Sequence, residues 1–443
     1  MSYSRSRTHE KKKARRSRRV RQLALLNVFL LVLIAVAAIW LLNGREFPRT
    51  GTAAGPGAAT HASEPGASAS ADPSASAPRG SKAPASSGSA SGDSASGDPN
   101  SDASSSDASS SDHPLPSGTD QPNAGGEDGD KLTLAFVGDL LPAGSVAGLM
   151  RKNGFDYPYR EARSLLESAD ITAGNLESPI TDRGTPEDDK QYLFRGPAEA
   201  LPALKEAGFD VLNLANNHTL DYGWVGLQDT MDALDDQGLR HMGAGIDDQK
   251  AFTPVYVEAK GMTVAFLGVT NVVPKVSWKA DRQHPGVAEI YNATRAIAAV
   301  KAAKENADLV VVMVHWGVEK KDTPINDQVV KGRQLIDAGA DLVIGSHPHV
   351  LQGFESYNGK WIAYSLGNFV FNTTASPKTS ETGVLTASCA KGGGCDLQFH
   401  PMLARNSQPA PMDETAGQTL LSRLAAVSAT VNVEENGDIV EKR

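Results

Sequence analysis

From Lys131 onward, short apolar runs alternate along the chain with stretches of helical character. Apolar runs of strand length, each followed by polar or turn-forming residues, occupy residues 132–137, 171–173, 210–214, 308–314 and 342–344. An alternation of strands and helices is typical of a sheet whose strands run mostly parallel. We therefore predict one α/β domain over residues 131–443.

Further segments complete the expected set of elements. Helices are expected over residues 198–207, 224–237, 294–306, 329–338 and 418–429, with Thr294 as the N-cap of the third. Hairpins are expected to turn at Lys260-Gly261 and at Asn358-Gly359, where Asn-Gly is a strong turn signal. The segment 431–440 is expected to finish the domain. The hairpins should add antiparallel strands to a largely parallel sheet.

The N-terminal part of the chain has a different pattern. Residues 23–42 form an apolar run whose one strongly polar member is Asn27. As a helix, a run of this length would cross about 30 Å of hydrocarbon. Residues 1–22 before it are strongly basic, which predicts a cytoplasmic N-terminus and an extracellular C-terminal domain. A cleaved signal peptide is the alternative, but its apolar region would be shorter. We favour an uncleaved signal anchor that makes the protein a single-pass protein of the cell membrane.

Residues 43–130 are mostly Ala, Ser, Gly, Pro and Asp. So few large apolar side chains cannot offset the entropy lost on ordering, which predicts a disordered tether. A glycosylated stalk is the alternative that the composition leaves open.

Charge and cysteine content narrow the functional classes. The formal net charge is −9, yet residues 1–21 carry ten Lys or Arg residues and one acid, so the rest of the chain sums to −18. The basic residues lie where a topology signal is expected, and we predict no nucleic-acid partner. The two cysteines, Cys389 and Cys395, are too few for a Cys-built zinc site. Outside the cell, joined by a short Gly-rich turn, they are expected to form a disulfide.

Candidate chemistry gathers where the predicted strands end. Five apolar runs are followed by polar clusters, in order Asp139, Asn175 with Glu177, Asn217 with His218, His315, and His347 with His349. Because parallel strands bring their carboxyl ends to one edge of a sheet, these side chains should meet there. Singly, each has an ordinary explanation as a capping or turn residue. In His347-Pro348-His349, the proline would hold two imidazoles at a fixed relative angle.

The combination of donors suggests a metal centre. Two carboxylates, an Asn and three imidazoles form a mixed oxygen and nitrogen set, which suits Mn²⁺, Zn²⁺ or Fe better than Mg²⁺ or Ca²⁺. A bridging carboxylate would allow two ions about 3.5–4 Å apart to activate a water for attack at phosphorus.

Six ordered motifs carry a family resemblance. The chain resembles the poly-γ-glutamate capsule synthesis protein family (CapA-type), which is similar to the calcineurin-like metallophosphoesterases. The motifs are Gly138-Asp139, Asn175-Leu176-Glu177, Asn216-Asn217-His218 with Asp221-Tyr222-Gly223, His315-Trp316-Gly317-Val318-Glu319, Gly345-Ser346-His347-Pro348-His349-Val350 and Ser365-Leu366-Gly367-Asn368-Phe369. The resemblance covers residues 131 to about 372 well and the tail loosely, and it implies a four-layer α/β/β/α sandwich.

The resemblance also implies roles for individual residues. It makes Asp139 and His349 ligands of a first metal, Glu177 the bridging carboxylate, and Asn217, His315 and His347 ligands of a second metal; His218 would be the acid that assists the leaving group. Two departures weaken the dinuclear site. Leu141 stands where the phosphoesterase pattern has a His, and the longer Glu177 replaces a bridging Asp. One ion, two ions or an empty site all remain open.

Two residues are candidates for substrate binding. Arg195, beside the family-like Gly196-Pro197, could orient an anion with two hydrogen bonds, or could be a plain surface arginine. Asn175 is the second candidate.

Three functions compete for this chain. The first is a part in the synthesis, export or anchoring of an anionic capsule polymer such as poly-γ-glutamate, beside other membrane subunits of capsule synthesis. The second is a metal-dependent phosphoesterase acting on a nucleotide, lipid or wall phosphate. The third is a catalytically silent polymer-binding module. Fold alone does not decide among them, and the metal content of the folded domain is the most informative observation.

Overall fold

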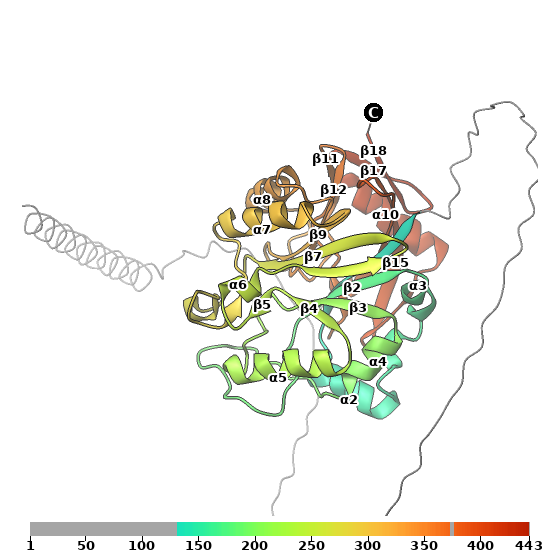
Figure 1. The fold of residues 1–443 in the computed structure, drawn as a ribbon. Coiled ribbons are helices and arrows are strands. Elements are labelled where there is room, and N and C mark those ends of the chain that lie inside the picture. Colours follow the sequence, from blue (N-terminus) through green and yellow to red (C-terminus); the bar gives the residue numbers. More distant parts are fainter. Residues whose placement is uncertain (1–130, 373–375, 443) are drawn as a thin grey trace, which may run out of the picture. The chain divides into compact units, whose positions relative to one another are not determined.

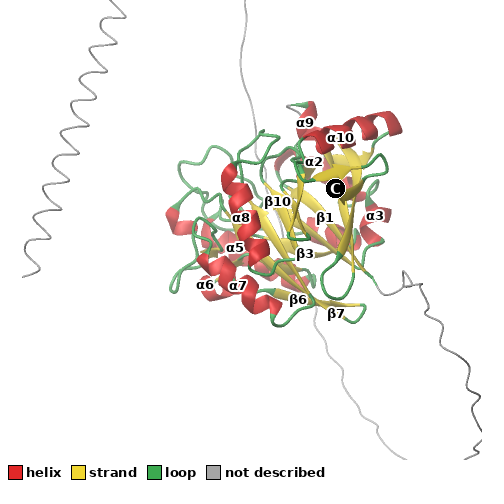
Figure 2. Ribbon diagram, turned by 90° about the horizontal axis from the view of Figure 1, so that it is seen from above, coloured by secondary structure: helices red, strands yellow, loops and turns green. Residues whose placement is uncertain are grey.

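Two β-sheets packed face to face, with helices on their outer faces, form the core of the part of the chain that the structure describes (Figures 1 and 2). The structure, a computed structural model, describes residues 131–372 and 376–442. This mixed α/β arrangement confirms the predicted fold class. The predicted basic tail (1–22), transmembrane segment (23–42) and tether (43–130) lie outside the described residues.

The larger sheet is mixed. Its central strands β1 (Leu132–Leu140), β2 (Ile171–Leu176), β3 (Phe209–Asn213) and β4 (Arg240–Met242) run parallel to their neighbours in the order β1-β2-β3-β4. The short β13 (Asn368–Val370) pairs with the end of β1. On the other side of β1 the sheet continues with antiparallel strands, namely β14 (Glu381–Cys389), β15 (Cys395–Arg405), β16 (Gln408–Pro411), β17 (Val431–Val433) and β18 (Asp438–Glu441).

The smaller sheet has the order β11-β12-β10-β9-β7-β6. Its strands are β6 (Val255–Ala259), β7 (Met262–Thr270), β9 (Leu309–His315), β10 (Leu342–Ser346), β11 (Phe354–Tyr357) and β12 (Lys360–Ala363). Strands β7, β9, β10 and β12 run parallel, and two hairpins supply the edges. Both hairpins turn where the sequence predicted, at Lys260-Gly261 and Asn358-Gly359, and all four turn residues have positive φ. A separate pair joins β5 (Ala244–Gly245) to β8 (Gly286–Val287).

Helices cover the outer face of each sheet. Those on the larger sheet are α2 (Gly144–Asn153), α3 (Arg163–Glu167), α4 (Ala200–Glu206) and α5 (Gly223–Asp236), with the 3₁₀ turn η2 (Tyr157–Tyr159). Those on the smaller sheet are α6 (Asp248–Ala251), α7 (Thr294–Lys304) and α8 (Asn326–Asp337). The remaining elements are η3 (Val276–Trp278), α9 (Pro377–Ser380) and α10 (Glu414–Ala426). In Figure 1, α7 and α8 lie on one side of the sheets and α2, α4 and α5 on the other.

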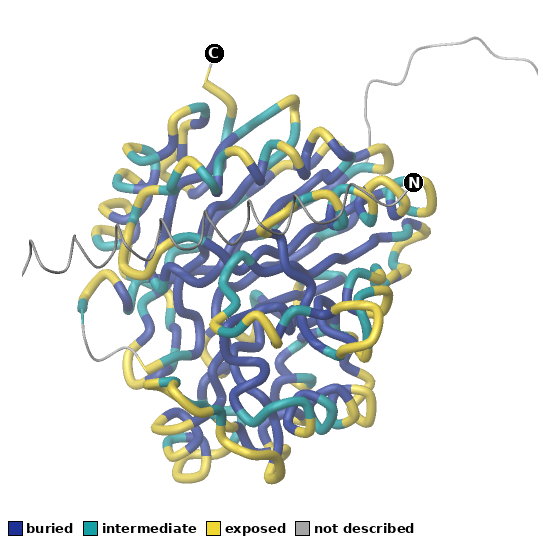
Figure 3. Tube along the Cα trace, turned by 90° about the vertical axis from the view of Figure 1, so that its left-hand side faces the viewer, coloured by how far each residue is buried: buried dark blue, intermediate teal, exposed yellow. Residues whose placement is uncertain are grey.

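Three apolar clusters hold these layers together. Buried residues concentrate in the centre of the molecule, coloured dark blue in Figure 3. The cluster between the sheets follows strand alternation: Leu309, Val311 and Met313 of β9 point into it, whereas the residues between them face the helices. Helix α10 closes this middle layer with Leu420, Leu421 and Leu424. The central strands are continuous apolar runs in the sequence because their side chains are buried on both faces of the sheet.

One local prediction was wrong in detail. Thr294 is the first residue of α7 rather than its N-cap, and its backbone N–H donates to Asn292 Oδ1 at 3.0 Å. The segment 431–440 contains β17 and β18, which form a hairpin. Strands β1 and β10 also run further than expected and include Asp139 and Ser346.

A disulfide joins Cys389 and Cys395 across the β14–β15 hairpin, as predicted. A residue pair of this kind, on adjacent strands, fixes the register of the hairpin. Among the described residues, no helix is long and apolar enough to cross a membrane.

Candidate metal centre

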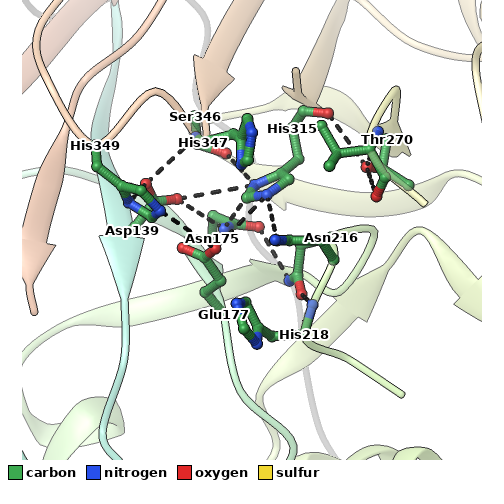
Figure 4. A network of polar contacts seen from close by, with 12 residues as sticks. Asp139, Asn175, Glu177, Asn216, His218, Thr270, His315, Ser346, His347 and His349 are labelled. Carbon is green, nitrogen blue, oxygen red and sulfur yellow. Dashed lines mark hydrogen bonds and ion pairs between the residues drawn. The ribbon is translucent and has the colours of Figure 1, made fainter. Parts of the chain in front are cut away.

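The layer between the sheets changes from apolar to polar at the carboxyl ends of its parallel strands. In β9 the inward positions Leu309, Val311 and Met313 are followed, two residues on, by His315. The same alternation makes Asn175 follow Ala173 in β2, and Ser346 follow Ile344 in β10. The period of two therefore delivers polar side chains from both sheets to one buried end of the core (Figure 4).

A β-bulge in β1 brings Asp139 to this place. The register of β1 against β2 shifts between Phe136 and Asp139, and Leu140 accordingly packs with Val137 in the outer cluster. A shift of one residue reverses the faces of a strand, so Asp139 gains the inward side that Phe136 occupies. Gly138 makes the bulge feasible because a Cβ there would lie 1.9 Å from the carbonyl oxygen of Gly367.

The loop after β10 presents two histidines in an uncommon conformation. His347 has φ of 95° and His349 has φ of 57°, both in the region that favours glycine. Backbone strain of this kind persists where surrounding contacts demand it, and it concentrates at functional sites. The loop is held by the His347 N–H, which donates to Asp139 Oδ2 at 3.3 Å, and by the carbonyl of Pro348, which accepts from the Lys320 N–H at 2.7 Å.

The cluster contains two overlapping groups of ligand atoms. Glu177, His315 and His347 form one group, termed here the histidine half; Asp139, Glu177 and His349 form the other, termed the carboxylate half. Within each half the ligand atoms all lie within 4.8 Å of one another. Glu177 belongs to both halves, which is the arrangement that a bridging carboxylate requires.

Unpartnered polar atoms test whether this cluster fits a metal ion. Among the described residues, neither carboxylate oxygen of Glu177 has a hydrogen-bond partner, although Glu177 is fully buried. His347 Nδ1 is also buried without a partner. Leaving such atoms bare is costly, and buried polar groups are nearly always satisfied. A divalent cation would satisfy them, so the residues fit the ion that the donor set suggested.

Burial and neighbouring charges shift the ionisation of the cluster. Burial raises the pKa of Glu177 well above its ordinary value, and the negative charge of Asp139 raises it further. Burial lowers the pKa of His347 to about 3 and that of His315 well below its ordinary value. Burial also opposes the charged form of His349, but Glu177 and Asp139 outweigh it and raise the pKa of His349 to about 10.

Hydrogen bonds orient His315 toward the cluster. Its Nε2 lies 2.8 Å from Asn217 Oδ1 and 3.6 Å from Glu177 Oε1, so this nitrogen faces the ligand atoms. Its Nδ1 lies 3.1 Å from Ser346 Oγ, a group that can accept or donate. Ligating histidines are commonly held by a partner on their other nitrogen, and Ser346 can fill that role.

Asn175, a predicted substrate-binding residue, is enclosed by other polar residues of the cluster. Its side chain is fully buried, and its amide donates to Asp139 Oδ1 at 2.8 Å. Its oxygen accepts from the amides of Asn213 and Asn216 at 2.9 and 3.3 Å. Because both its amide nitrogen and its amide oxygen are hydrogen-bonded, Asn175 fixes the orientation of Asp139 and has no polar atom left for a ligand.

His218 lies at the edge of the cluster in a charged environment. Its Nδ1 lies 2.8 Å from Asp221 Oδ2 and 3.0 Å from the Nζ of Lys190. Burial lowers the pKa of His218, while the hydrogen bond with Asp221 opposes that shift. The ring of Phe194 packs on the imidazole, with 4.6 Å between ring centroids.

The remaining predicted residues occupy different surroundings. Arg195 is exposed, and its guanidinium packs 4.5 Å from the centroid of the Tyr222 ring. Its Nη1 donates to the carbonyl of Asp182 at 3.4 Å, and neither contact is with the cluster. Leu141 is buried and offers no ligand atom. The structure thus brings together the six predicted metal ligands and His218, while Arg195 lies apart.

Sequence reasoning missed Lys190. The residue comes from a segment without helix or strand, where one lysine among charged neighbours carries no signal. Asp221 stood in a quoted motif, but its contacts with His218 and Lys190 could not be read from spacing alone.

Comparison with known proteins gives a consistent picture. The family profile described as "Bacterial capsule synthesis protein PGA_cap" matches residues 133–373, more than half of the chain. The "PGA biosynthesis protein CapA" of Bacillus subtilis (strain 168) is 34% identical over 318 residues, which cover 70% of this chain and 82% of the relative. The "Capsule biosynthesis protein CapA" of Bacillus anthracis is 35% identical over 292 residues, covering 64% and 70%.

A solved structure also matches, but more weakly. The 5'-nucleotidase from Candida albicans SC5314 aligns with 61% of this chain and 52% of its own, at 13% sequence identity and a TM-score of 0.37. A likeness of this size carries no argument about function.

Proposed function

The chain belongs to the bacterial capsule synthesis protein family, and from this premise we propose that it takes part in making, exporting or anchoring an anionic capsule polymer such as poly-γ-glutamate, with a divalent metal centre in its folded domain. The polymer is suggested by the relatives, whose names specify PGA and capsule biosynthesis. The metal centre is suggested by the residues themselves.

One observation carries the metal centre. Glu177 is a fully buried carboxylate whose two oxygens have no hydrogen-bond partner among the described residues, and it lies in both halves of the cluster. A buried carboxylate without hydrogen bonds is costly as an anion, and the ion pair of Glu177 Oε1 with His349 Nε2 is long, at 4.0 Å. A cation shared between the two halves would supply that compensation.

The proposed ligands divide between two positions. Asp139 and His349 would hold one ion, and Asn217, His315 and His347 the other, with Glu177 shared. Mn²⁺, Zn²⁺ or Fe suits these nitrogen and oxygen donors. A bound ion of this type lowers the pKa of a coordinated water and polarises a carbonyl or phosphoryl oxygen. The chain's own residues orient the ligands: Asn175 holds Asp139, and Ser346 contacts His315.

A metal-dependent phosphoesterase is the second candidate, and the surroundings of His218 favour it. The Asp221 carboxylate accepts from Nδ1 of His218, which fixes the imidazole with its Nε2 free to pass a proton. Leu141, which removes one expected ligand, favours the third candidate, a polymer-binding module without catalysis.

The location of the protein is part of the proposal. The apolar run 23–42 and the basic residues before it support a single-pass anchor with residues 131–443 outside the cell. Membrane-bound capsule synthesis subunits would then be natural partners. Protease added to intact, wall-stripped cells should remove the C-terminal domain and spare the N-terminus; a protected domain would contradict this topology.

Complementation tests the function. In a host that makes poly-γ-glutamate and lacks its own copy of this protein, the wild-type chain should restore cell-associated polymer. Glu177→Gln, which keeps the size of the side chain but lowers its capacity to bridge ions, should not. Normal polymer with Glu177→Gln would separate the metal centre from the function, and no polymer with the wild type at equal expression would contradict the function itself.

A further inference from the structure

A long segment without helix or strand, residues 182–195, packs against the loop that carries Asn217 and His218; we term it the strap. It is anchored on Asp221, which is fully buried. The Glu187 N–H donates to the Asp221 carbonyl at 2.9 Å, and the Phe194 N–H donates to Asp221 Oδ2 at 2.7 Å. The position of the strap therefore depends on its contacts with the loop Asn217–Asp221, termed here the site loop.

Lys190 is the residue of the strap that reaches the metal ligands. Its Nζ donates to the backbone carbonyl of Asn217 and pairs with Asp221 Oδ1, and its side chain is 13% exposed. The Trp278 ring lies 5.0 Å from Nζ and covers the ammonium group, a favourable contact for a cation. Two of the three N–H donors of Lys190 thus form hydrogen bonds with the loop Asn217–Asp221.

Donor and acceptor roles define how the three groups fit together. A carboxylate accepts only, so the 2.8 Å contact between Asp221 Oδ2 and His218 Nδ1 is a hydrogen bond only if Nδ1 carries the hydrogen. Lys190 then holds the other oxygen of Asp221 rather than the imidazole. The lysine and the histidine therefore share one carboxylate, and Lys190 adds the carbonyl of Asn217.

The strap has a second anchor through the side chain of Glu187. Glu187 pairs with Lys275, and its Oε2 accepts from Trp278 Nε1 at 3.1 Å. Lys275 and Trp278 belong to the connection that follows β7. Lys275 pairs with a residue of the strap itself, whereas Lys190 contacts Asn217, the residue before His218.

We propose that Lys190 is a positioning residue of the metal centre: by fixing the carbonyl of Asn217 and the carboxylate of Asp221, it sets the affinity for the ion held by Asn217, His315 and His347. This inference rests on the proposed metal centre. Asn217 Oδ1 lies 2.8 Å from His315 Nε2, so a rotation of the Asn217 peptide would separate two ligands of the same ion.

The proposal predicts a selective loss of metal affinity. Partners that orient a metal ligand typically contribute about 10–100-fold to affinity. Lys190→Met in the purified full chain should weaken the ion of the histidine half by about tenfold or more. The ion of the carboxylate half should keep its affinity, because neither Asp139 nor His349 contacts Lys190. Titration with Mn²⁺ and with Zn²⁺, followed by calorimetry, measures both affinities without reference to catalysis.

Lys275→Met is the matched control, since it removes the ion pair between Lys275 and Glu187 but leaves the contacts of Lys190 with Asn217 and Asp221 in place. It should bind both ions like the wild type. Lys190→Gln keeps a donor for the Asn217 carbonyl but has no charge. Its affinity for the ion of the histidine half should lie between those of Lys190→Met and the wild type. If Lys190→Met does not fold, Lys190→Gln serves as the test variant.

The outcomes separate the two proposals. A wild-type chain that binds neither ion overturns the metal centre and this inference with it. A wild-type chain that binds metal, with unchanged affinities in Lys190→Met or, if that variant does not fold, in Lys190→Gln, overturns the role of Lys190 alone. Equal losses in Lys190→Met and Lys275→Met also overturn it, because they would show that any loosening of the strap has the same effect.

Discussion

The two halves of the metal centre share Glu177 but are prepared for a cation to different degrees. In the histidine half, burial holds the pKa of His347 and of His315 below the ordinary value, so both imidazoles are neutral and free to bind a metal. In the carboxylate half, His349 has its pKa raised to about 10 by Glu177 and Asp139, so it carries a proton at neutral pH. A histidine ligates only as the neutral base.

This difference explains how one buried site can bind two ions with different affinities. The histidine half gains its cation without removing a proton from either imidazole, whereas the carboxylate half must first give up the proton of His349. Leu141 adds to the inequality, because the family resemblance places an expected ligand at its position. We expect the ion of the histidine half to bind more tightly.

The largest effect should come from His315→Ala. This change removes a neutral ligand of the tighter ion, and the weaker ion depends on Glu177, the ligand that it shares with the tighter one. We expect the variant to lose both ions in an elemental analysis of the purified chain. Retention of the wild-type metal content would break the comparison, since it would make the histidine half dispensable.

His349→Ala should have a smaller effect on metal content. It removes a ligand of the weaker ion only, so one ion should remain where the wild type binds two. Calorimetric titration with Mn²⁺ checks this by the number of binding events. Loss of the tighter ion in this variant would show that the two halves act as a single site.

The pH dependence should separate the halves further. Because His349 has a pKa of about 10, uptake of the weaker ion should release its proton, and affinity should fall about tenfold for each unit by which the pH is lowered below that value. His315 and His347 contribute no such slope near neutral pH, because the pKa values of both are lowered. The shared Glu177 affects both ions, so the informative quantity is the difference between their slopes. Titrations in buffers of different ionisation enthalpy measure the protons released; equal release for both ions would contradict the assignment.

The smallest effect on metal should come from His218→Ala. His218 contacts Asp221 and Lys190 rather than the ligand atoms, so both ions should stay. If the centre hydrolyses an aryl phosphate, the rate should fall by about 10²–10⁴-fold, the usual contribution of a positioned acid. A metal loss equal to that of His315→Ala would refute this division of roles.

Much of the centre could be predicted because strands have a period of two and parallel strands end together. Those rules place His315 and the groups after β1, β2, β3 and β10 at one edge. They could not show that Asn175 is enclosed by Asp139, Asn213 and Asn216, because burial depends on all the strands at once. The bulge that turns Asp139 inward depends on the approach of Gly367 to Gly138, a contact between distant parts of the chain. Lys190 depends on the path of the strap, which no periodic pattern marks.

The most direct test of the metal centre is the metal content of the full chain and of its Glu177→Gln variant, loaded with Mn²⁺ or Zn²⁺ and washed under the same conditions. Glu177 is the one ligand common to both halves. We predict that the wild type retains at least one ion per chain and that the variant, folded to the same extent, retains none. Equal retention by both chains, or no retention by the wild type, would contradict a metal centre built around Glu177.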